Sequence, residues 1–61
     1  MDEKKLWQKA CVLARTYYEA LEEKSWDDAD KYEREDYFFY VYSKLKENKN
    51  LNVDDLLSVK N

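Results

Sequence analysis

Apolar side chains recur every three or four residues in the first third of the chain. This is the spacing of one face of an α-helix, in which successive residues turn by about 100°. The apolar positions are Leu6, Trp7, Ala10, Leu13, Ala14, Tyr17, Tyr18, Ala20 and Leu21. They cover close to half of the helix circumference, which is too wide an arc for one neighbouring helix to bury. The pattern predicts a helix over roughly residues 3–23 that needs more than one packing partner.

The aromatic segment DYFFYVYSKL, residues 36–45, could form either a strand or a second helix. Tyrosine, phenylalanine and valine favour strands, but the flanking segments are compatible with a helix and contain no turn residue that would end one. Ser25 has the side chain of a helix N-cap, and Asp28 is placed to bond back to it. We therefore predict a helix over roughly residues 26–49, joined to the first by a short connection as an antiparallel hairpin.

This second helix is predicted to be apolar on two faces. One stripe, expected to pack on the first helix, contains Tyr37, Phe38, Val41, Tyr42 and Leu45. The other side carries Ala29, Tyr32, Phe39 and Tyr40. Trp7, Tyr17, Tyr37 and Phe38 are interpreted as core, because a small chain must fill its interior with large side chains. The second face is left for a partner molecule or for a third helix.

The last part of the chain predicts a short third helix over residues 53–59. Asparagines at 48, 50 and 52 are expected to end the preceding helix in the left-handed conformation. Asn52 is also a cap for the following LNVDDLL segment, and Leu51 is placed to pack on Leu56 as a hydrophobic staple. Residues expected to cover part of the first helix are Val53, Leu56, Leu57 and Val59. The predicted fold is all-α: an antiparallel helical hairpin plus a short C-terminal helix, in one domain over 1–61.

Composition supports this prediction and limits the function. The 61 residues include no glycine and no proline, so tight hairpin turns between strands would be hard to form. A chain of this size buries little surface, and oligomerisation would stabilise it. No apolar run approaches the roughly 18 residues that span a bilayer, so no membrane partner is expected. A single cysteine, Cys11, fits a reducing cytoplasm and is expected to pack at the edge of an apolar face.

Enzyme classes find little support in the sequence. Without histidine there is no standard catalytic triad or cysteine–histidine pair, and without glycine there is no phosphate-binding loop. The acidic segment DDADKYERED lacks the spacing and the glycine of a calcium loop. We expect no catalytic residue, no cofactor, no metal and no small-molecule substrate.

Acidic residues gather at the predicted start of the second helix. The net charge is −3, and residues 25–36 hold six acidic and two basic side chains. The acidic patch comprises Asp27, Asp28, Asp30 and Glu33. Carboxylates suit the positive end of a helix dipole, and their excess argues against nucleic acid as a partner. Carboxylates can also imitate a phosphate backbone, but such a mimic would be expected to carry far more negative charge.

The functional hypothesis is a small, non-enzymatic, cytoplasmic protein-interaction module. In its leading form the chain is a homodimer in which two hairpins make a four-helix bundle through both long helices. The predicted interface residues are Tyr32, Asp36, Phe39 and Tyr40. The alternative is an acidic inhibitor or adaptor of one larger protein, with nucleic-acid mimicry as one form of it. A composition rich in lysine, asparagine, acids and tyrosine resembles that of proteins from low-GC bacteria and their phages.

Overall fold

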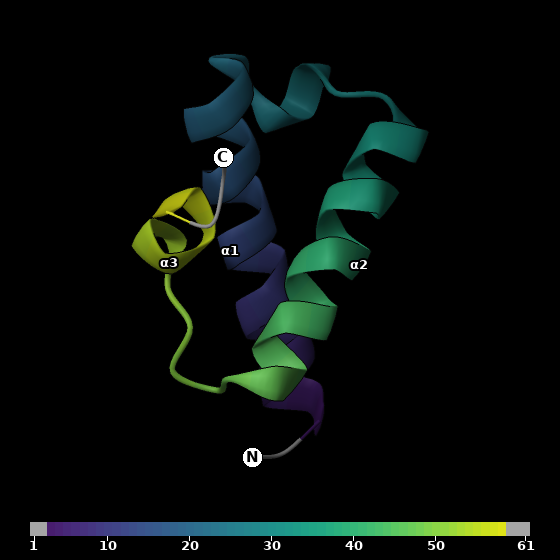
Figure 1. Cartoon of the computed structure of the whole chain (residues 1–61). Helices are drawn as coiled ribbons and strands as arrows, with labels where there is room; N and C mark the ends of the chain where they lie inside the picture. The colour runs from purple at the N-terminus through teal and green to yellow at the C-terminus, as the bar shows by residue number, and fades with distance from the viewer. Residues whose placement is uncertain (1–2, 59–61) are drawn as a thin grey trace.

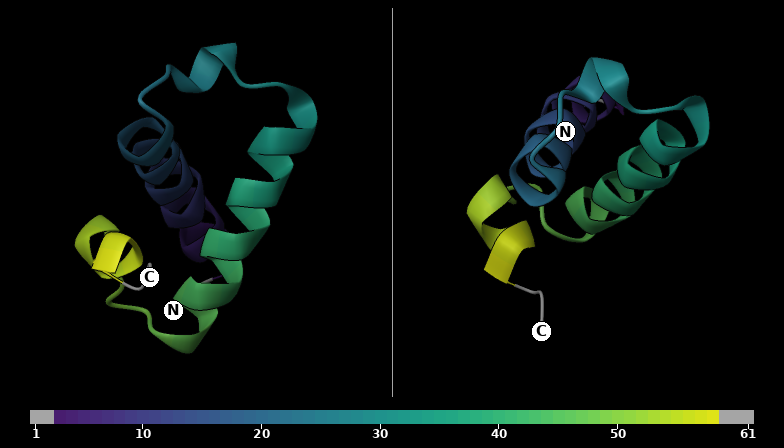
Figure 2. Two further views of the ribbon diagram at one scale, coloured as in Figure 1. Left: turned by 45° about the horizontal axis from the view of Figure 1, so that its top comes forward. Right: turned by 90° about the horizontal axis from the view of Figure 1, so that it is seen from above.

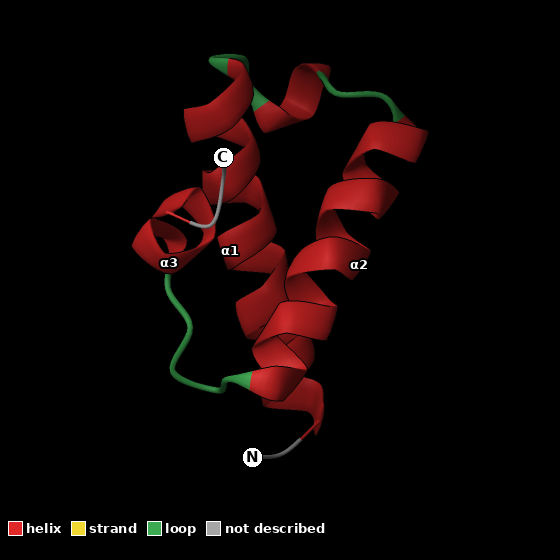
Figure 3. Cartoon of the chain, viewed as in Figure 1, coloured by secondary structure: helices red, strands yellow, loops and turns green. Residues whose placement is uncertain are grey.

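The computed structural model describes residues 3–58, and all regular structure in that range is helical (Figure 3). Two long helices, α1 (Glu3–Glu22) and α2 (Lys31–Glu47), lie antiparallel to one another, as Figure 1 shows. They are joined through a 3-10 turn, η1 (Trp26–Asp28), and a short helix, α3 (Val53–Ser58), packs beside α1. The predicted all-α class, with two long packed helices and a short third, is confirmed.

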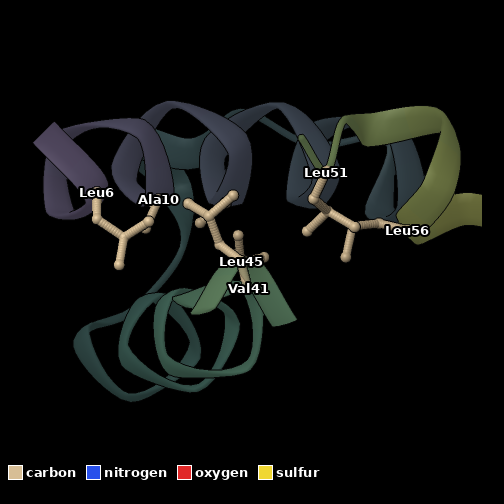
Figure 4. Close-up of a cluster of buried hydrophobic side chains, with 7 residues drawn as sticks. Leu6, Ala10, Val41, Leu45, Leu51 and Leu56 are labelled. Carbon is tan, nitrogen blue, oxygen red and sulfur yellow. The ribbon is translucent and has the colours of Figure 1, made fainter. Parts of the chain in front are cut away.

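Small and branched side chains fill the buried contact between α1 and α2. Ala10 and Ala14 of α1, and Val41 and Leu45 of α2, have no exposed surface. Alanine carries only a methyl group, so the α2 side chains approach the α1 backbone closely. Figure 4 shows these helices presenting their apolar side chains to one shared core. Full burial of each aliphatic side chain from α2 contributes about 2 kcal/mol.

The two long helices diverge toward their connection, as the views in Figure 2 show. Large aromatic side chains occupy this wider end. Tyr18 is completely buried, with its ring edge-on to Trp26 at 5.5 Å and to Tyr37 at 4.9 Å between centroids. Side-chain size along α1 therefore follows the separation of the helices, from Ala10 and Ala14 to Tyr18.

The chain after α2 closes the core through two leucines. Leu51 and Leu56 are 8% and 1% exposed and belong to the same buried cluster, as the predicted staple requires. The backbone N–H of Asp55 donates to Oδ1 of Asn52, and the Asn52 N–H donates to Oδ2 of Asp55, both at 3.1 Å. Asn52 thus caps α3 as predicted. The predicted end of this helix and the predicted packing of Val59 lie outside the described residues.

The prediction that the second helix starts at residue 26 is wrong. Ser25 accepts a bond from the Asp27 N–H at 3.2 Å, but it caps only the single turn of η1. The backbone is then extended at Ala29 and Asp30. Ala29, which was placed on the outer face of α2, is only 3% exposed. The helix is interrupted here because the chain buries Ala29 and packs Trp26 on Tyr18.

Asp30 is the N-cap of α2. Its carboxylate accepts from the Glu33 N–H at 2.9 Å, and the Glu33 side chain accepts from the Asp30 N–H at 3.3 Å. This reciprocal pair satisfies two backbone donors that the helix cannot pair internally. Two of the four residues of the acidic patch therefore have a structural role.

The predicted left-handed asparagine is also wrong. Asn48, at the end of α2, has φ −141°, and its side chain accepts from the Asn50 N–H at 3.1 Å. Among residues 3–58, positive φ occurs at Glu23 instead, with a value of 59°. The Glu23 N–H still makes the helical bond to the Glu19 carbonyl at 3.0 Å, and α1 ends there because the positive φ turns the chain out of the helix. A side chain in this conformation costs about 1 kcal/mol, which glycine would avoid.

Replacing Asp30 by alanine is expected to lower the free energy of unfolding by about 1 kcal/mol, the usual cost of losing an N-cap. Ser25→Ala is expected to cost about half of that or less, because Ser25 caps a single turn. Urea unfolding followed by circular dichroism measures both variants. A larger loss in Ser25→Ala than in Asp30→Ala would contradict the start of α2 at Asp30.

Candidate functional site

Four aromatic rings from both long helices form one continuous group, here called the aromatic cluster: Trp7, Phe38, Phe39 and Tyr42. The Trp7 ring lies 4.5 Å from Phe38 and 5.4 Å from Tyr42, and Phe39 contacts Phe38 edge-on at 5.2 Å, measured between centroids. Trp7 and Phe39 are nevertheless 48% and 56% exposed. The prediction that Trp7 is core is therefore wrong, because α2 covers only one side of its ring.

A strip along one flank of α2 continues this cluster along the helix, and within it Tyr42 is partly buried against the core. Its members, here called the heptad strip, are Tyr32, Glu35, Phe39, Tyr42 and Lys46. They follow one another at alternating intervals of three and four residues, which is the spacing of a helix–helix seam. Tyr32 is 73% exposed, and Glu35 and Lys46 are also exposed. The strip thus has an aromatic middle, a carboxylate in its first half and an ammonium group at its last position.

A second aromatic surface is an open cleft between α1 and α2, with a volume of about 230 Å³. This tyrosine cleft is lined by Tyr17, Leu21, Asp36, Tyr37 and Tyr40. The Tyr17 ring stacks on Tyr40 with centroids 6.0 Å apart and planes 23° apart, and lies 5.6 Å from Tyr37. Among the described residues that line the cleft, Asp36 is the only acidic one and none is basic.

The four predicted interface residues divide between these two surfaces. Tyr32 and Phe39 belong to the heptad strip, whereas Asp36 and Tyr40 line the tyrosine cleft. Consecutive residues of a helix point about 100° apart, so Phe39 and Tyr40 face in different directions. The alternating spacing of the heptad strip is a sequence signal that separates them. No comparable sequence signal indicates that Trp7 is exposed, because the pattern of apolar residues in α1 does not show which side of the wide apolar arc stays uncovered.

Carboxylates accept hydrogen bonds from tyrosine hydroxyls at both aromatic surfaces. The Tyr37 hydroxyl donates to Oε2 of Glu22 at 2.5 Å, and the Tyr42 hydroxyl donates to Oε2 of Glu3 at 3.3 Å. Burial raises the pKa of Tyr37 above its usual value, and the bond to Glu22 adds to this effect. Burial also raises the pKa of Tyr17. Tyr17 and Tyr37 therefore remain neutral phenols at ordinary pH.

The remaining candidate groups are simpler. Of the acidic patch, Asp27 and Asp28 are exposed on η1, while Asp30 and Glu33 are engaged in the cap. Cys11 is exposed, so its predicted packing role is wrong. Between residues 3 and 58, no three histidine, cysteine or acidic side chains are grouped so that they could hold a metal ion. None of the described helices has the length and apolar character needed to cross a membrane.

Comparison of the chain with protein-family models, with curated proteins and with solved structures gives no match. The function is therefore argued from the two aromatic surfaces and the charges beside them.

The burial of Tyr37 and its hydrogen bond to Glu22 predict a loss of stability at alkaline pH. The folded chain holds the Tyr37 proton more tightly than the unfolded chain, whose tyrosines titrate near pH 10.0. As pH rises above 10, the unfolded state releases this proton first, so the free energy of unfolding falls. Urea unfolding between pH 8 and 11 is expected to show a shallower fall in Tyr37→Phe. Identical slopes in the variant and the wild type would contradict the role of Tyr37.

Proposed function

We propose that this protein is a non-enzymatic interaction module that self-associates as a homodimer, with the heptad strip of α2 and the adjoining Trp7 as its contact surface. The observation that carries the proposal is the exposure of Phe39, 56%, at the centre of a strip with helix-seam spacing. Exposed aromatics that adjoin one another are typical of interface centres. Burying them in a dimer also increases the small core of a chain of 61 residues.

The charges of the strip favour an antiparallel arrangement of the two α2 helices. About a two-fold axis at Phe39, the Phe39 side chains of both copies meet each other. Tyr32 of one copy then lies opposite Lys46 of the other, and Glu35 lies within reach of the same ammonium group. Lys46 already lies 5.3 Å from the Tyr42 ring centroid, so its ammonium group is close to the aromatic surface. A parallel pair would instead bring like charges together.

The other long helix completes a four-helix bundle in this proposal. Trp7 of α1 contacts Phe38 and Tyr42 of α2, so it borders the strip and would contact the second copy. A two-fold interface uses the same patch on both copies and closes the assembly at two. In a reducing cytoplasm the exposed Cys11 remains a thiol, and the proposed dimer is held by non-covalent contacts alone.

Phe39→Asp is expected to raise the dimer dissociation constant roughly 30-fold or more, corresponding to about 2 kcal/mol for a central aromatic anchor. The matched control is Val12→Asp, which adds the same charge at an α1 side chain that is 65% exposed and outside the strip. Light scattering during size-exclusion chromatography, over a hundredfold range of concentration, measures the mass of each. A wild-type chain that is monomeric at every concentration would refute the dimer.

Charge exchange tests the antiparallel register. Glu35→Lys is expected to weaken the dimer roughly five-fold, because two lysines then face each other across the seam. Adding Lys46→Glu to the same chain should restore the wild-type dissociation constant, since opposite charges again meet between copies. Failure of the double variant to recover the affinity lost in the single variant would exclude this register.

The second proposal is an acidic adaptor that binds one larger protein, for which the exposure of Asp27 and Asp28 is the supporting observation. A monomeric wild type would favour it. Its distinguishing property is a partner affinity that falls steeply with added salt. Charge reversal belongs at Asp27 and Asp28, since reversal at Asp30 or Glu33 would also remove the cap of α2.

A further inference from the structure

The tyrosine cleft is a site separate from the proposed dimer surface, and its size limits what it can hold. Its volume, about 230 Å³, is below the roughly 300–1,000 Å³ of pockets that enclose whole small molecules. It is open to solvent and lined by five side chains, three of them tyrosines. These dimensions suit the head of one side chain presented by another molecule.

We propose that the tyrosine cleft binds an arginine side chain of a partner protein, with the guanidinium group against the tyrosine rings and paired with Asp36. The faces of aromatic rings attract cations, and a carboxylate beside them supplies the opposite charge. The cleft combines both features and contains no basic side chain among its lining residues.

An interaction within the chain supports the affinity of these rings for cations. The Lys44 ammonium group lies 5.6 Å from the centroid of the Tyr40 ring, although Lys44 does not line the cleft. Tyr40 is therefore already close to one ammonium group, which comes from outside the residues that line the cleft. Tyr17 and Tyr37 offer similar rings inside it, where Leu21 supplies an apolar surface.

The negative charge around the cleft adds to this preference. Glu22 accepts the hydrogen bond of the Tyr37 hydroxyl at 2.5 Å, so a second carboxylate lies beside the cleft. The Tyr37 hydroxyl thus points its proton toward Glu22, and the electron-rich ring is held in place. Asp36 and Glu22 thus supply two carboxylates against the one ammonium group of Lys44 near Tyr40, which leaves an excess of negative charge at the cleft.

Guanidinium fits this arrangement better than an ammonium group. It is planar, weakly hydrated and able to stack on tyrosine rings, while its N–H groups match the two oxygens of a carboxylate. An ammonium group is compact and strongly hydrated, and an open cleft leaves it in water. The arginine site lies on a different surface from the heptad strip. The arginine proposal and the homodimer proposal can therefore fail independently.

Titration of the ¹⁵N-labelled wild-type protein with acetyl-arginine amide, monitored by NMR, tests the site. The probe is expected to shift the amide signals of Leu21, Asp36, Tyr37 and Tyr40. Acetyl-citrulline amide, which has the same shape without the charge, is expected to leave them unchanged at equal ionic strength. Equal shifts from both probes, or no shifts around the cleft up to the solubility limit of the arginine probe, overturn the proposal.

Substitutions at Tyr40 and Asp36 provide matched controls, because both side chains are exposed and neither belongs to the buried cluster. Tyr40→Leu is expected to weaken binding of the arginine probe roughly three-fold, whereas Tyr40→Phe keeps the ring and the affinity. Asp36→Asn, which preserves the shape of the side chain, is expected to weaken it by a similar factor. Unchanged affinity in both Tyr40→Leu and Asp36→Asn overturns the site even if the probe binds elsewhere.

Discussion

The packing of α2 against the alanines of α1 determines where every other surface of this molecule lies. Ala10 and Ala14 let Val41 and Leu45 approach the α1 backbone, and all four side chains are fully buried. This contact fixes the orientation of α2, and so it determines on which flank of the contact each neighbouring side chain of α2 lies. Phe38 and Tyr42 contact Trp7 on one flank, and Tyr37 and Tyr40 contact Tyr17 on the other.

The two aromatic surfaces differ in shape, and this difference separates their proposed roles. The heptad strip follows one helix and is bounded by charges of opposite sign, which suits a second helix running the other way. The tyrosine cleft is concave and has carboxylates beside it but no lining base, which suits a single cationic group. One chain of this size can therefore present two chemically distinct contacts within a few helical turns.

Polar side chains cap the starts of the helical segments. Ser25, Asp30 and Asn52 each accept a backbone N–H at the start of a helical segment. This use of carboxylates explains part of the acidic patch without any ligand. Glu23 adopts positive φ at the end of α1, where a glycine would be expected. The positive φ of Glu23 is unfavourable for a residue with a side chain, but it turns the chain toward η1.

The helical class, the length of α1, the cap at Asn52 and the stripe containing Val41 and Leu45 could all be predicted from the sequence, because helical periodicity and capping are local properties. The break before α2 could not be predicted, since it depends on the burial of Ala29 and on the packing of Trp26 against Tyr18 of α1. The exposure of Trp7 and Cys11 could not be predicted either. An apolar arc wider than one helix can cover leaves several faces open to a partner, and only the packing of α2 and α3 selects which of them remains in solvent.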